Sequence, residues 1–234
     1  MCAAPRFDDP AALRRASFAG LAFLVLVLAG ALFLPAGTVR YWRAWVWLAV
    51  FVGTVLAITL HLLRRDPDLL RRRLVAGPVA EARPLQRVLQ ALASGTFVAV
   101  FVLAGLDRRL AWSSVPAAAS LVADAVVGAG LAVVFLVFRE NSHASAVVEV
   151  SAGQRVVSTG PYRHVRHPMY SGALLLLFAT PFALGSLTAL LPVLALAGVI
   201  VARLRDEERL LVRELPGYEA YRREVRYRLV PGVW

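Results

Sequence analysis

Lysine is absent from this chain of 234 residues, cysteine occurs once, and the motifs of several large enzyme classes are missing. Because Cys2 is the single cysteine, the chain can form neither an internal disulfide nor a cysteine-based metal site. The four histidines show no metal-ligand spacing, so no metal site is predicted. The phosphate-binding loop of nucleotide hydrolases and the GxGxxG, GxSxG and HExxH motifs do not occur. The enzyme classes that carry these motifs are therefore not indicated.

Apolar side chains, in contrast, are in excess. They make up 59% of the residues, and the mean hydropathy is +0.66, whereas an ordinary soluble domain has about 45–50% apolar residues. This composition predicts an integral membrane protein. The net charge of +11 comes from arginines that flank the apolar runs. It therefore indicates membrane topology and contact with the lipid bilayer, and no binding of nucleic acid.

Six apolar runs predict an all-α membrane protein with about six transmembrane helices. The first four runs cover 17–34, 42–63, 88–106 and 115–138. The first run could instead be a signal peptide, but it is near the length of a spanning helix and no soluble domain follows it. The last two runs, 169–184 and 187–202, are short and are separated by Gly185-Ser186, which predicts a helix–turn–helix hairpin.

These runs divide the chain into two predicted parts. Residues 1–138 are expected to form an N-terminal four-helix membrane region. Residues 139–234 are expected to form a catalytic region made of a cytoplasmic loop, the membrane hairpin and C-terminal helices. Within that loop, strand-like residues on both sides of Gly153 predict either a short hairpin over 147–158 or an extended loop.

The distribution of arginine predicts the orientation of the spans. If the N-terminus is cytoplasmic and the chain crosses six times, 22 of the 26 arginines lie on the cytoplasmic side. Such an asymmetry follows the positive-inside rule and predicts that both termini are cytoplasmic. The exclusive use of arginine fits a GC-rich bacterial genome, so the predicted location is a bacterial inner membrane. The four arginines on the opposite side are Arg40, Arg43, Arg108 and Arg109.

A first polar run precedes the hairpin and carries candidate site residues. Arg163 and His164 fit a basic surface beside lipid phosphates. The next residues lead into Pro168 at the first turn of the predicted helix, where free N–H groups suit an anion. The candidates at this point are Arg166, His167, Tyr170 and Gly172.

A second polar run follows the hairpin and contains Arg203, Arg205, Glu207 and Glu208. Spacing alone predicts local ion pairs on a solvated helix face, Arg203 with Glu207 and Arg205 with Glu208. Alternatively, a carboxylate below a membrane hairpin can accept hydrogen bonds from ribose hydroxyls, as in nucleotide sites. Asp124 is the one acid in the fourth apolar run, where it indicates either a functional site or a hydrogen bond between helices.

An ordered set of motifs covers residues 150–234. It consists of Gly160-Pro-Tyr-Arg-x-Val-Arg-His-Pro-Met-Tyr-Ser-Gly172, Gly185-Ser186, Glu207-Glu208, Pro216-Gly-Tyr-x-x-Tyr221 and a closing Arg-Leu-Val-Pro231. This set resembles the isoprenylcysteine carboxyl methyltransferase family and the related phospholipid methyltransferases. The short Gly128-Ala-Gly130 also resembles an element of the latter, although close helix packing explains it better.

The resemblance implies a membrane-embedded methyltransferase that uses S-adenosylmethionine and releases S-adenosylhomocysteine. Such a transfer needs positioning and exclusion of water more than acid–base groups, so the missing catalytic motifs are expected. The resemblance also implies the residues that contact or enclose the cofactor. They are His167, Tyr170, Gly172, Glu207, Glu208, Leu215, Pro216 and Tyr218.

The methyl acceptor stays open among an isoprenylcysteine-like carboxylate, a phospholipid amine and a small thiol. From their position at the membrane edge, Arg203 or Arg205 is expected to hold an acceptor carboxylate or phosphate, with Arg166 as the third catalytic candidate. Two other functions are compatible with the sequence, an NADPH-dependent membrane reductase of the sterol-reductase type and a non-enzymatic membrane scaffold. The sequence does not indicate an oligomeric state.

Overall fold

The computed structural model describes residues 9–151 and 153–234. Cys2 and Arg6 lie outside the described residues. Within the described part of the chain every regular element is a helix, and no strand is present. The all-α prediction is therefore confirmed, and the described residues of 147–158 form an irregular loop instead of a hairpin.

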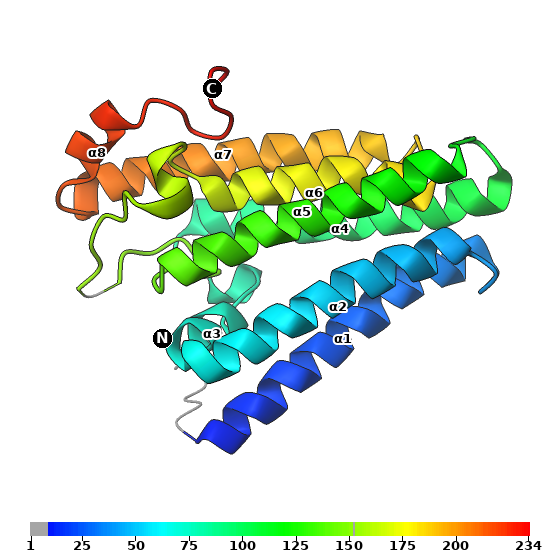
Figure 1. Cartoon of the computed structure of the whole chain (residues 1–234), viewed down its shortest axis with the longest axis horizontal. Helices are drawn as coiled ribbons and strands as arrows, with labels where there is room; N and C mark the ends of the chain where they lie inside the picture. Colours follow the sequence, from blue (N-terminus) through cyan, green and yellow to red (C-terminus); the bar gives the residue numbers. More distant parts are fainter. Residues whose placement is uncertain (1–8, 152) are drawn as a thin grey trace.

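Long helices that alternate in direction make up the body of the molecule. They are α1 (Pro10–Ala36), α2 (Trp42–Arg65), α4 (Pro84–Leu110), α5 (Ala117–Glu140), α6 (Pro168–Leu184) and α7 (Leu190–Glu214). The shorter elements are α3 (Pro67–Leu74), α8 (Tyr218–Glu224) and the 3-10 turns η1 (Pro78–Ala80) and η2 (Gly160–Arg163). The loops that join the long helices gather at two opposite ends of the molecule (Figure 1).

Four helices, α1, α2, α4 and α5, are long and apolar enough to cross a bilayer. Helix α6 is apolar but has only 17 residues, and α7 is apolar only in its first half, because its second half, from Arg203 to Glu214, is rich in arginine and glutamate. The structure thus supports an integral membrane protein with four candidate spans. Crossing by the α6–α7 hairpin, and with it the count of six spans, stays a prediction.

The turn between α6 and α7 is held by a buried carboxylate on α4. Gly185 ends α6 in the left-handed region, with a φ of 74°, which glycine adopts without strain. Asp107 accepts hydrogen bonds from the Ser186 and Thr188 hydroxyls at 2.6 and 2.7 Å. The Gly185-Ser186 motif therefore forms this turn and anchors it to α4. The turn lies at the end of the hairpin away from the polar runs (Figure 1).

Close packing of α5 on α6 depends on two glycines. A Cβ atom at Gly130 would lie 2.7 Å from the carbonyl oxygen of Gly172, and a Cβ atom at Gly172 would lie 2.7 Å from the carbonyl oxygen of Gly130. Larger residues would push the two backbones apart. The packing explanation for Gly130 is thus supported, and the contact joins α5 directly to the hairpin. The predicted domain division at residue 138 stays a prediction.

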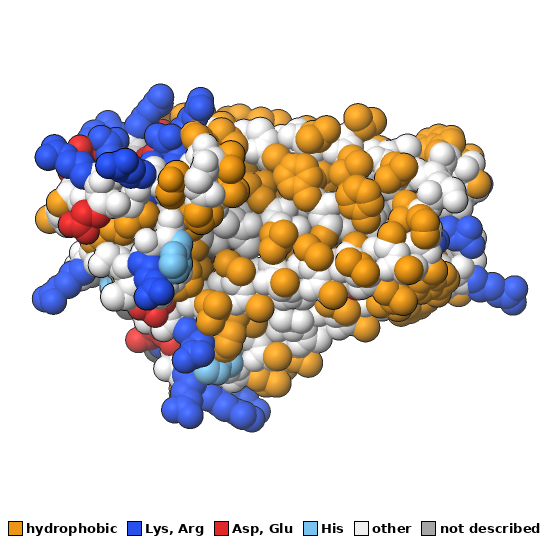
Figure 2. Space-filling view, turned by 45° about the horizontal axis from the view of Figure 1, so that its top comes forward, with side chains coloured by type: hydrophobic (Ala, Val, Ile, Leu, Met, Phe, Trp, Pro, Cys, Tyr) orange, Lys and Arg blue, Asp and Glu red, His pale blue; other side chains and the backbone are white. Residues whose placement is uncertain are grey.

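Arginine is concentrated at one end of the molecule. Figure 2 shows the apolar side chains along the helices and most of the basic ones at the end that carries α8, with a smaller basic group opposite. At the far end, Arg40 lies in a loop and Arg109 in the last turn of α4, whereas α3, α7 and α8 bring their arginines to the basic end. This separation agrees with the predicted membrane orientation, in which the basic end is cytoplasmic.

Candidate functional site

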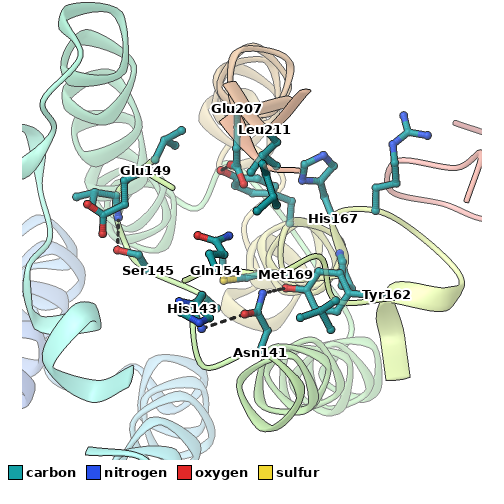
Figure 3. Close-up of a pocket in the computed structure, with 18 of the residues that line it drawn as sticks. Asn141, His143, Ser145, Glu149, Gln154, Tyr162, His167, Met169, Glu207 and Leu211 are labelled. Atoms are coloured by element: carbon teal, nitrogen blue, oxygen red, sulfur yellow. Dashed lines mark hydrogen bonds between the residues drawn. The ribbon is translucent and has the colours of Figure 1, made fainter. Parts of the chain in front are cut away.

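A cavity of about 400 Å³ lies at the arginine-rich end. It is bounded by α3, the loop 141–157, the first turn of α6, the end of α7 and α8. In Figure 3, Glu207 and Leu211 of α7 face Tyr162 and Asn141 across it, and Glu149 and Ser145 lie at its other side. Small-molecule and cofactor sites typically measure about 300–1,000 Å³, so the cavity has the size of a cofactor site.

The loop 141–157 is held in place by polar contacts at its beginning and near its middle. The Asn141 side chain donates a hydrogen bond of 2.9 Å to the Tyr162 hydroxyl and accepts one from the His143 backbone. Burial raises the pKa of Tyr162 to about 12, so its hydroxyl stays protonated. Further along, the Val148 backbone donates to Glu81, which precedes α4. These contacts tie the first half of the loop, from Asn141 to Val148, to its neighbours along the cavity wall.

The C-terminal segment closes over the beginning of α6. The backbone N–H groups of Arg166 and His167 donate to the carbonyl oxygens of Tyr227 and Arg228, at 2.9 and 3.0 Å. The Ser171 hydroxyl donates to the Leu229 carbonyl at 2.7 Å. The closing Arg-Leu-Val-Pro motif therefore fixes the Arg-His-Pro motif in space. These two N–H groups have partners within the protein, so they are not free to bind an anion.

Glu208 lies in a buried ionic cluster beside the cavity. Its carboxylate accepts from Arg166 Nε at 2.6 Å and Arg228 Nε at 2.7 Å, and it lies 3.3 Å from His167 Nε2. Burial alone would raise the pKa of Glu208, but the close contact with His167 and the hydrogen bonds from Arg228 and Arg166 together hold it well below its ordinary value. Glu208 is part of α7 beyond its apolar part, and its interactions join α6, α7 and the C-terminal segment.

Glu207 and its neighbours form a second polar group that opens into the cavity. The Tyr170 hydroxyl donates to Glu207 at 2.6 Å. Arg203 Nε donates to the same hydroxyl at 3.3 Å, and Arg203 Nη2 lies 2.6 Å from Glu81 Oε1 and 3.0 Å from the Ala146 carbonyl. Glu81 is 1% exposed, so the charge of Arg203 is balanced by a carboxylate deep in the protein.

The structure brings most of the predicted site residues together around the cavity. Those that line it are Arg166, His167, Tyr170, Arg203, Glu207, Leu215 and Tyr218. Four others do not line it. Gly172 packs on α5, Glu208 sits in the ionic cluster, Pro216 is exposed, and Arg205 lies outside with its guanidinium 5.7 Å from the Trp234 ring centre.

Sequence patterns did not indicate several residues of the cavity wall. They are Arg73, Asn141, His143, Glu149, Gln154, Tyr162 and Met169. Most of these lie in α3 or in the irregular loop, where no periodic pattern relates them to the hairpin. Tyr162 was within reach of prediction, because it belongs to the Gly160-Pro-Tyr-Arg motif and directly precedes the polar run.

Unsatisfied polar atoms test whether the cavity suits a polar ligand. Arg203 Nη1, His143 Nδ1 and the Tyr218 hydroxyl belong to cavity residues, are buried and have no hydrogen-bond partner within the described part of the chain. Buried polar atoms without partners are costly, so a ligand with several polar groups would stabilise this arrangement. Among the described residues, no group of three or more histidine, cysteine, aspartate or glutamate side chains could hold a metal ion.

Part of the chain matches a known protein family. Residues 118–216 match the phospholipid methyltransferase family. The matched region runs from α5 through the loop, the hairpin and the end of α7, and it includes most of the cavity wall. The resemblance indicated by the motifs is therefore confirmed. No curated protein matches the chain significantly.

Proposed function

We propose, from the match of residues 118–216 to the phospholipid methyltransferases, that this membrane protein transfers a methyl group from S-adenosylmethionine to a lipophilic or small acceptor. The family match supports a membrane methyltransferase. The cofactor and the acceptor are part of the proposal. The observation that carries it is the cavity itself, whose wall combines residues of the Arg-His-Pro, Glu-Glu and Pro-Gly-Tyr motifs.

The residues of the cavity suit the parts of a nucleoside cofactor. Glu207 offers a carboxylate for ribose hydroxyls. Among the described residues it accepts a single hydrogen bond, at Oε2 from the Tyr170 hydroxyl, so its other oxygen is available to a ligand. Leu211 and Leu215 provide an apolar wall, and Tyr218 presents a buried hydroxyl without a partner. His167 lines the same cavity and lies 3.3 Å from Glu208. These residues would bind and orient the cofactor, and they would exclude water from it.

When bound, S-adenosylmethionine would supply a methyl group carried on its sulfonium: an acceptor lone pair bonds to the methyl carbon in line with the breaking carbon–sulfur bond, whose electrons stay on sulfur. The protein then needs to hold the acceptor next to the cofactor and to keep water away. Phenol rings and carboxylates around the cavity favour a nearby cation. An isoprenylcysteine-like carboxylate, a phospholipid amine and a thiol each have a lone pair that could react.

Isothermal titration calorimetry on the purified protein tests the cofactor. We expect S-adenosylhomocysteine to bind and NADPH not to bind. Glu207→Ala and His167→Ala should each weaken S-adenosylhomocysteine binding by at least about tenfold, while the matched control Glu214→Ala, an exposed carboxylate on the same helix, should bind as the wild type does.

Binding of NADPH in place of S-adenosylhomocysteine would instead favour the reductase, and binding of neither would favour the scaffold. Unchanged affinity in both Glu207→Ala and His167→Ala would show that the cofactor lies elsewhere. The acceptor can then be sought by incubating the protein with lipid extracts and a cofactor labelled in its methyl group.

A further inference from the structure

Arg73 is a cavity arginine whose charge is not balanced by the protein. It lies in the last turn of α3 and lines the cavity on the side of the loop 141–157. Arg166 is paired with Glu208, and Arg203 with Glu81. Within residues 9–151 and 153–234, no carboxylate lies within ion-pair distance of Arg73. Its position is therefore unlike that of the other half-buried or buried cavity arginines.

The contacts of Arg73 orient the guanidinium but leave part of it free. Nη1 donates to the Ser145 carbonyl at 2.9 Å and lies 3.8 Å from the sulfur of Met169. The guanidinium carbon lies 5.0 Å from the centre of the Phe138 ring. Among the described residues, Nε and Nη2 have no hydrogen-bond partner, and the Arg73 side chain lines the cavity. Two N–H donors on one side of a guanidinium match the paired oxygens of a carboxylate or phosphate.

Burial makes this free charge costly. Desolvation, helped by the positive charge of Arg203, lowers the pKa of Arg73 to about 10, so the side chain is still cationic at neutral pH. A cation in such surroundings is stabilised when an anion enters. The α3 side of the cavity is thus suited to bind one negative charge next to the Arg73 guanidinium.

The surroundings of Arg73 indicate which ligand brings that charge. Met169 and Phe138 belong to an apolar cluster that also contains Ile58 and Leu62 of α2. The end of a membrane span thus lies next to the guanidinium. Glu207, Leu215 and Tyr218, which suit the cofactor, belong instead to α7, α8 and the turn between them. An anion beside apolar side chains at the end of the spans describes the headgroup of an amphiphile.

We propose that Arg73 binds the anionic headgroup, a carboxylate or a phosphate, of the lipophilic methyl acceptor. The inference rests on the proposed function, because it assigns the acceptor side of the same cavity. It places acceptor recognition on α3, before the residues that match the family, and away from Arg203 and Arg205. Arg203 is already neutralised by Glu81, and Arg205 does not face the cavity.

The test measures the binding of simple amphiphiles to protein saturated with S-adenosylhomocysteine. Octyl phosphate and octanoate, below their micelle concentrations, probe the two headgroups, and octyltrimethylammonium is the cationic comparison. We expect the wild type to bind at least one anionic probe and to bind it more tightly than the cation. Arg73→Gln should weaken anionic binding by at least about tenfold, and Arg73→Lys should retain part of it.

Arg65→Gln is the matched control, since it removes the same charge from an exposed position at the same end of the protein. Its probe affinities should equal those of the wild type. The affinity for S-adenosylhomocysteine should be the same in all four proteins, and this separates the inference from the proposed function.

Equal weakening in Arg65→Gln and Arg73→Gln would show a general surface effect and overturn the inference. So would wild-type protein that binds neither anion, or that binds the cation equally well. Loss of S-adenosylhomocysteine binding in Arg73→Gln alone would also overturn it, because Arg73 would then bind the cofactor. Failure of the wild type to bind S-adenosylhomocysteine would instead refute the proposed function. The ratio of the phosphate and carboxylate affinities identifies the headgroup.

Discussion

Glu207 and Glu208 are adjacent in sequence, and replacing each in turn separates binding from stability. We expect Glu208→Ala to destabilise the fold and Glu207→Gln to weaken cofactor binding with little effect on stability. The Glu208 carboxylate is 5% exposed and connects Arg166, His167 and Arg228, whereas Glu207 lines the cavity and accepts one hydrogen bond, from Tyr170. The resemblance alone assigned both carboxylates to the cofactor.

The size of the stability effect follows from burial. Removing one partner of a buried ion pair costs about 3–5 kcal/mol, because the other charge is left uncompensated. For a chain of this size, each 1 kcal/mol corresponds to about 2–4 °C in melting temperature, so Glu208→Ala should melt roughly 6–20 °C below the wild type. In Glu207→Gln the amide oxygen can still accept from Tyr170, and the melting temperature should change by less than about 2 °C.

The assay is thermal unfolding of the detergent-solubilised proteins together with calorimetric titration of S-adenosylhomocysteine. Glu207→Gln should bind it at least about tenfold more weakly. Glu208→Ala, titrated well below its melting temperature, should lose less affinity than Glu207→Gln. If Glu208→Ala melts with the wild type and loses as much affinity as Glu207→Gln, both carboxylates act on the cofactor and the reasoning is wrong.

The difference in melting temperature between the wild type and Glu208→Ala should also depend on pH. The pKa of Glu208 is lower in the folded protein than in the unfolded chain, where it is about 4.3. The stabilisation is therefore fully present above that unfolded value and is lost as pH falls toward the folded value. The melting difference between wild type and Glu208→Ala should stay constant from about pH 8 to pH 5.5 and should shrink below about pH 4.

Three further predictions address packing, the unpaired hydroxyl and the buried Glu81. Gly172→Ala should lower the free energy of unfolding by about 1–3 kcal/mol, because its Cβ would clash with the Gly130 carbonyl. Calorimetry should show an unchanged affinity for S-adenosylhomocysteine. A loss of affinity without a loss of stability would mean that Gly172 contacts the cofactor. Tyr218→Phe removes a buried hydroxyl that has no partner, so the melting temperature should hold or rise while cofactor affinity falls severalfold; equal affinity would show that the hydroxyl does not reach the ligand. Glu81→Gln should lower the melting temperature and speed tryptic cleavage at Arg155. It removes the charge partner of Arg203 and weakens the hydrogen bond from the Val148 backbone. Cleavage at Arg155 at the wild-type rate would contradict this prediction.

The parts of the fold that the sequence predicted are those with a local signal. The apolar runs predicted α1, α2, α4 and α5 because a bilayer requires a minimum length of apolar helix. Gly185 predicted the hairpin turn because it ends α6 in a left-handed conformation. The family motifs predicted part of the cavity wall because they surround it from α6, α7 and α8.

Contacts between distant elements had no such signal, and there the local rules were wrong. Helical spacing predicted ion pairs of Arg203 with Glu207 and of Arg205 with Glu208. In the structure Arg203 pairs with Glu81, and Glu208 pairs with Arg166 and Arg228. Arg203 and Glu208 are both buried, and their ion-pair partners lie on other elements. A solvent-exposed ion pair along one helix contributes little free energy, whereas a buried charge needs a partner that is buried with it.

Some of the residues that shape the proposed acceptor side of the cavity lie outside the family-matched region. Arg73 and Glu81 precede the matched region 118–216, yet Arg73 lines the cavity and Glu81 holds Arg203 and the loop backbone at Val148. The proposed cofactor contacts, by contrast, come from α6, α7 and α8. Changes in α3 and in the residues just before α4 can therefore alter the charge and shape of the acceptor side without touching Glu207 or Tyr218. We infer that the N-terminal part of the chain does more than anchor the hairpin, because it supplies Arg73, a cavity arginine with no carboxylate partner among the described residues.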